Sequence, residues 1–115
     1  MNRYKLFKAG VDVNQGLKRF DNNKEFYESL LVYFLNDTNY IELQNAMKEK
    51  NVKKAFGHAH ALKGVTGNLS FTRLYGALIP FVEKLREGDF QGAQELFGEV
   101  QAAYEAVEDA IKGDK

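Results

Sequence analysis

Apolar side chains recur every three or four residues along most of the chain, which is the period of an amphipathic α-helix. One such stripe consists of Tyr27, Leu30, Leu31, Phe34, Thr38 and Ile41. No segment alternates in the Val/Ile/Thr-rich manner of a strand, and the chain contains a single proline. The pattern therefore predicts an all-α protein.

Turn and capping residues divide this pattern into five predicted helices, over residues 13–20, 24–49, 52–69, 71–87 and 90–111. The expected N-caps include Asp12, Asn23, Asn51 and Ser70. The second helix could bend at residues 36–39, and Pro80 predicts a kink in the fourth. Short connections between long helices predict an antiparallel up-down four-helix bundle with a short extra N-terminal helix. The 115 residues fit one domain, 1–115, with a core from about 9 to 111.

The net charge, the cysteine count and the lengths of the apolar runs exclude or disfavour several classes of function. The net charge is zero, with 16 basic and 16 acidic residues, which argues against a nucleic-acid partner. Cysteine is absent, so no disulfide or cysteine metal site is expected. No apolar run reaches the roughly 18–20 residues of a membrane span, and the start lacks a signal-peptide pattern. We therefore expect a cytoplasmic protein without direct membrane insertion. We also expect it to be a monomer.

The predicted helix over 52–69 carries a histidine on an unusual face. Projected at about 100° per residue, His60 points away from the apolar side of this helix. Its own side holds Lys53, Phe56, Gly57, Lys63, Gly64 and Gly67. Each helix-interior glycine costs roughly 1 kcal/mol relative to alanine, so three on one face are expensive for stability alone. We infer that the three glycines leave the imidazole open to close approach by another protein. The alternative explanation is that they allow close helix–helix packing.

The chemistry of this face suits phosphoryl transfer. An imidazole is largely neutral near pH 7 and is then a nucleophile. A phosphoryl group on His60 would add nearly two negative charges, which Lys63, one turn away, could reach. Lys53 would add positive field, and Phe56 is expected to be an exposed apolar anchor for a partner. His58 lies about 160° further round the helix, so we expect a half-buried structural residue and no metal site.

The segment His60-Ala61-Leu62-Lys63-Gly64 resembles the His-x-Leu-Lys-Gly signature of histidine-containing phosphotransfer (Hpt) domains. The likeness extends from about Ala9 to Ala110. It implies that His60 accepts a phosphoryl group from a receiver-domain aspartate and passes it to another receiver. Lys63 would assist, and Gly64 and Gly67 would keep the approach open.

The same resemblance implies the partners and cofactors. Response-regulator receiver domains and a sensor histidine kinase would be the partners. The chain would be a phosphocarrier, not an enzyme, and would need no cofactor, because Mg²⁺ belongs to the partner receiver. One departure is Ser70, which stands where the family often has glycine.

Two other functions remain open from the sequence. The first is a non-catalytic helical protein-interaction module, which would never be labelled on His60. The second is the phosphoacceptor domain of a chemotaxis-type histidine kinase, which would take its phosphoryl group directly from an ATP-bound catalytic domain.

Overall fold

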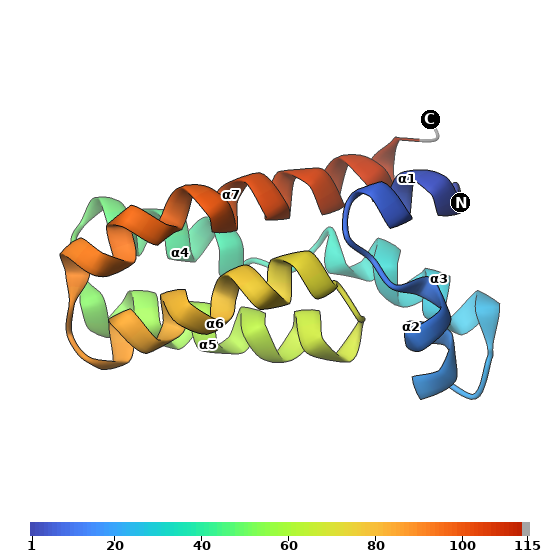
Figure 1. Ribbon diagram of the computed structural model, residues 1–115, viewed down its shortest axis with the longest axis horizontal. Helices are drawn as coiled ribbons and strands as arrows, with labels where there is room; N and C mark the ends of the chain where they lie inside the picture. Colours follow the sequence, from blue (N-terminus) through green and yellow to red (C-terminus); the bar gives the residue numbers. More distant parts are fainter. Residues whose placement is uncertain (114–115) are drawn as a thin grey trace.

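The computed structural model describes residues 1–113, which form seven α-helices (Figure 1). The helices are α1 (Arg3–Lys8), α2 (Val13–Arg19), α3 (Lys24–Phe34), α4 (Asn39–Lys48), α5 (Val52–Asn68), α6 (Thr72–Arg86) and α7 (Phe90–Lys112). The all-α prediction is therefore confirmed. None of these helices is long and apolar enough to cross a bilayer.

The four C-terminal helices form a bundle. Helix α5 packs against both α4 and α6, and α6 packs against α7. Figure 1 shows these four lying alongside one another, with α2 and α3 gathered at one end and α1 beside the last turns of α7. Short turns join α4 to α5, α5 to α6 and α6 to α7, so each packed pair is also adjacent in sequence.

Asparagine and aspartate side chains begin most of the helices. In each case the side-chain oxygen accepts a hydrogen bond from the backbone N–H three residues later, which satisfies a donor that the first turn leaves free. These caps are Asn2, Asp12, Asn23, Asn51 and Asp89. The caps predicted at Asp12, Asn23 and Asn51 are confirmed.

The cap predicted at Ser70 is wrong. Phe71 is the N-cap residue of α6, and Ser70 instead ends α5 in the left-handed region, with φ +63°. The Ser70 N–H donates to the Gly67 carbonyl and the Phe71 N–H to the Thr66 carbonyl. This is the Schellman arrangement, which favours glycine at the left-handed position.

The single helix predicted over 24–49 is also wrong, because α3 and α4 are separate. The break falls where a bend was possible, and Asp37 Oδ1 accepts from the Asn39 N–H at 2.8 Å across it. The interruption shifts the helical phase. Tyr40 is consequently buried, whereas Ile41, which continued the predicted stripe, is 60% exposed.

Helix α1 was not predicted, so two short helices, α1 and α2, precede α3 where the sequence predicted one. It buries Leu6, and it packs against α7. The Lys5 ammonium donates to the Gly113 carbonyl at 2.9 Å. Six residues with a single buried side chain give no periodic signal, which is why the sequence did not reveal this helix.

The core lies between the packed helices and is rich in aromatic rings. Tyr40 stacks on Tyr104 with ring centroids 3.7 Å apart. The buried Tyr27 hydroxyl donates to the Leu69 carbonyl at 2.7 Å and so ties α3 to the turn after α5. Helix α6 continues through the exposed Pro80 from Thr72 to Arg86.

Candidate functional site

Helix α5 presents His60 on its outer face. The buried side of the helix consists of Ala55, Ala59, Leu62 and Thr66. His60 is exposed on the opposite side, which is the direction that the helical projection predicts. The two buried alanines are small, so the neighbouring helices can pack closely behind the histidine without covering it.

The three glycines of this face have two different surroundings. A Cβ atom added to Gly57 or Gly64 would meet nothing within 4 Å. A Cβ added to Gly67 would lie 3.0 Å from Cε1 of Tyr75, on α6. Gly57 and Gly64 thus leave bare surface beside His60, whereas Gly67 makes room for an aromatic ring. Close helix packing, the alternative explanation for the glycines, holds at Gly67 alone.

Phe56 differs from the exposed anchor that was predicted. It is half-buried, and its ring centroid lies 5.6 Å from that of His60. Arg86, near the end of α6, places its guanidinium carbon 5.0 Å from the Phe56 centroid. Arg86 Nε also lies 3.2 Å from Glu83 Oε1, within hydrogen-bonding distance. Phe56 is therefore a partly covered wall of the site, because a cation lies over its face.

The lysines are placed as the projection predicts, with Lys53 exposed and Lys63 half-buried. Lys63 also lines a hollow of about 490 Å³ between α2, α5 and α6. Arg19, from α2, lines the same hollow, as do Gly64 and Tyr75. Arg19 is thus a second cation in the hollow that Lys63 lines, and the sequence did not reveal this placement because Arg19 comes from a different helix.

His58 is half-buried, as predicted, and faces α4. Its Nδ1 atom lies 3.0 Å from Oδ1 of Asn39. Since an amide oxygen can only accept, this geometry makes His58 Nδ1 the donor. The two histidines thus point to different sides of α5, one held against a neighbouring helix and one exposed.

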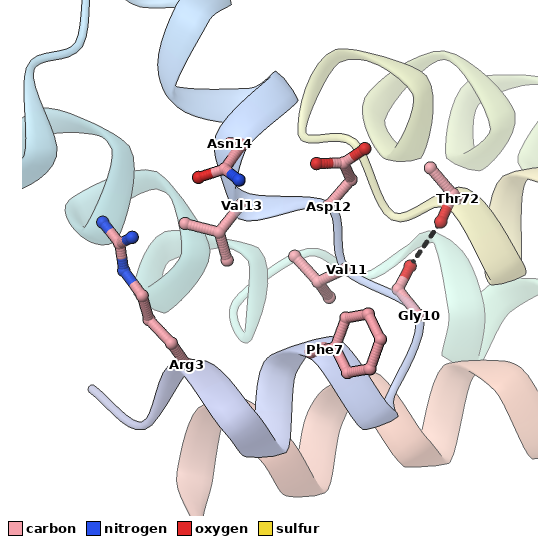
Figure 2. Close-up of a pocket in the computed structure, with 8 residues that line it drawn as sticks. All are labelled: Arg3, Phe7, Gly10, Val11, Asp12, Val13, Asn14 and Thr72. Carbon is pink, nitrogen blue, oxygen red and sulfur yellow. Dashed lines mark hydrogen bonds between the residues drawn. The ribbon is translucent and has the colours of Figure 1, made fainter.

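A second hollow, of about 470 Å³, lies at the connection between α1 and α2 (Figure 2). Thr72 Oγ1 donates to the Gly10 carbonyl at 2.9 Å on its edge. Asp12 Oδ1 already accepts from the Gln15 N–H at 3.0 Å as the cap of α2. The hollow offers Arg3 as its cation, and its lining includes no histidine, cysteine or lysine. Its Thr72 hydroxyl and Asp12 carboxylate are already engaged in these hydrogen bonds, so the histidine face is the better candidate. Residues 1–113 contain no group of three or more His, Cys, Asp or Glu side chains that could hold a metal ion.

Comparison with protein families bears directly on the bundle that carries this face. A family model described as the Hpt domain matches residues 37–110, well over half of the chain. The matched residues include α4, α5, α6, most of α7 and the whole His60–Gly64 segment. The chain belongs to the Hpt domain family. Comparisons with curated proteins and with solved structures each found no match.

Membership of the Hpt family places the protein in two-component phosphorelay signalling. Hpt domains are phosphocarrier modules of such relays, not classical enzymes, and they interact with receiver domains and histidine kinases. The resemblance noted from His60-Ala61-Leu62-Lys63-Gly64 is thereby confirmed at the level of the family.

Proposed function

We propose that this Hpt domain accepts a phosphoryl group on His60 from the aspartyl phosphate of a receiver domain and passes it to the aspartate of another receiver. In the first step the unprotonated ring nitrogen of His60 forms the N–P bond. The P–O bond to the receiver carboxylate breaks, and the carboxylate leaves with the electron pair. The second step is the reverse reaction on a different receiver.

The observation that carries the proposal is the exposed imidazole on a face cleared of side chains. A second protein must bring its aspartate within bonding distance of His60, and Gly57 and Gly64 leave the space for that approach. Lys63, one turn along α5, can reach the three phosphoryl oxygens. The positive charges of Lys53 and Lys63 on the same face would favour the charged phosphohistidine.

Residues of this chain would hold and orient the phosphoryl group, and the catalytic Mg²⁺ would be supplied by the receiver. We also propose that the domain acts as a cytoplasmic monomer. The packing of α4 to α7 would serve as an up-down four-helix scaffold that keeps the histidine face rigid.

The test is transfer from a receiver domain phosphorylated on its aspartate by a radiolabelled small-molecule donor. We expect label on the wild-type chain that is lost in acid, as a phosphoramidate bond requires. His60→Gln should abolish labelling with unchanged helicity and melting, because His60 is exposed. The matched variant, His58→Gln, should retain labelling.

Three outcomes would contradict the proposal. Labelling that survives in His60→Gln and disappears in His58→Gln would assign the wrong histidine. Labelling only by an ATP-bound kinase domain would indicate a kinase phosphoacceptor domain. Absence of label with every receiver and kinase tested would indicate an interaction module.

A further inference from the structure

Helix α6 exposes two large apolar side chains beside the histidine face. Tyr75 is 37% exposed and Ile79 is 43% exposed. They are four residues apart and therefore lie on one side of the helix, one turn from each other. The buried residues of α6, which include Leu74, Leu78 and Phe81, follow a different stripe. Tyr75 and Ile79 are therefore not needed to fill the core.

Two contacts fix where this apolar strip lies relative to His60. Tyr75 lies against Gly67, near the C-terminal end of α5, and Arg86 lies over Phe56, near its N-terminal end. Helices α5 and α6 thus run in opposite directions. Ile79 falls between these contacts, on the same stripe of α6, and so lies level with the middle turns of α5 that carry His60.

The opposite flank of His60 is formed by α4 and has a different character. Asn39 marks the side of α4 that faces α5, since it contacts His58. Glu42 is three residues further on and therefore lies toward that side, and the exposed Glu49 follows the end of α4 in the turn that leads into α5; Glu42 is exposed as well. Two carboxylates there would repel a partner whose reactive centre is itself acidic.

We propose that the receiver domain docks across α5 and α6 and packs an apolar surface on Tyr75 and Ile79, and that this contact orients its aspartate toward His60. The inference rests on the proposed function and names the side from which the partner approaches. A specific interface covers roughly 800 Å² on each partner, so a protein bonded at His60 must spread over one of the two flanking helices. The α6 flank offers apolar area, and its acid Glu83 is paired with Arg86.

The strip also continues into an existing depression. Tyr75 lines the hollow between α2, α5 and α6 that also contains Lys63 and Arg19. A partner lying along α6 would cover this hollow and bring its acidic centre toward two cations. Apolar contact would then supply affinity, and the cations would speed association.

The test compares Ile79→Ser and Tyr75→Ser with Ile41→Ser. Ile41 is the matched control because it is 60% exposed on α4. The probe is a receiver domain phosphorylated on its aspartate that labels the wild-type chain. The measured quantity is the kcat/KM of transfer. A second reaction uses phosphoramidate, a small donor that phosphorylates imidazole without docking.

We expect Ile79→Ser to lower kcat/KM by about tenfold, mainly through KM, with Tyr75→Ser in the same direction and Ile41→Ser at the wild-type value. Labelling by phosphoramidate should be equal in all four proteins, which shows that His60 and the fold are intact. An equal kcat/KM in Ile79→Ser and the wild type, or a loss of kcat/KM confined to Ile41→Ser, would refute the proposal that the receiver docks on α6. If phosphoramidate labels His60 but no receiver does, the proposed relay function fails and the docking proposal falls with it.

Discussion

Replacing Ser70 with glycine should make the protein more stable. Ser70 adopts φ +63° at the end of α5, where a side chain that carries a Cβ costs about 1–2 kcal/mol. It is 2% exposed, and its hydroxyl has no hydrogen-bond partner among residues 1–113. An unsatisfied buried polar group of this kind costs about 1–3 kcal/mol.

Glycine removes both costs but adds freedom to the unfolded chain, which offsets about 0.5–1 kcal/mol. We therefore expect Ser70→Gly to raise the free energy of unfolding by about 1–4 kcal/mol, with Tm rising by roughly 4–6 °C for each kcal/mol in a domain of this size. The backbone hydrogen bonds of the turn, including the Asp12 N–H to the Ser70 carbonyl at 2.8 Å, need no side chain and should persist.

Urea unfolding followed by circular dichroism measures this effect, and two further variants separate its causes. Ser70→Ala removes the hydroxyl and keeps the left-handed strain, so it should give only part of the gain. Gly88→Ala adds a Cβ at φ +78°, where nothing lies within 4 Å, and should lower stability by about 1 kcal/mol through strain alone. A Ser70→Gly variant no more stable than the wild type would refute the reasoning.

Two further predictions concern the site and the core. Gly64→Glu should leave the fold intact, because a Cβ at this position has open space. The variant should nevertheless slow transfer from a phosphorylated receiver, because the side chain blocks the approach and adds negative charge. Gly98→Glu, at an equally open position on α7, is the control and should accept the phosphoryl group at the wild-type rate. Burial raises the pKa of Tyr27 and of Tyr104 to about 12, so the neutral phenols stabilise the fold fully below pH about 10, and this contribution is lost as pH rises toward 12. Alkaline denaturation curves should therefore be shallower for Tyr27→Phe than for the wild type, and identical curves would contradict this linkage.

Much of the fold could be predicted because the core stripes and caps are local signals. Asn51 begins α5 as predicted, since a side-chain cap needs only the next turn of the chain. The break between α3 and α4 was less visible because the apolar period runs across it, and only the burial of Tyr40 reveals the changed phase. Ser70 misled the prediction because serine suits an N-cap, whereas the preceding helix demanded a left-handed residue at that position.

The side of α5 on which His60 is exposed could be predicted from that helix alone, but the residues of other helices that flank His60 could not. The projection of α5 gives the exposed side and places the glycines and lysines there. It does not reveal which helix flanks them. The partial cover of Phe56 by Arg86 and the place of Tyr75 against Gly67 both depend on the pairing of α5 with α6. The exposed apolar pair on α6 was detectable in principle, as residues off the buried stripe of that helix, but its position beside His60 was not.

The three glycines on the exposed face of α5 have two different structural roles. Two of them leave open surface beside His60, and the third accommodates a neighbouring side chain. Gly57 and Gly64 each cost roughly 1 kcal/mol of helix stability, and a Cβ added at either would meet nothing within 4 Å, so no close packing within residues 1–113 requires a glycine there. Gly67 gives up a similar amount but receives the Tyr75 ring. Without that close approach Tyr75 would stand further from α5, and Ile79 alone would form the apolar strip. In the proposed docking, the bare positions set how near the receiver comes to His60, and Gly67 sets the position of the Tyr75 ring on which the receiver packs.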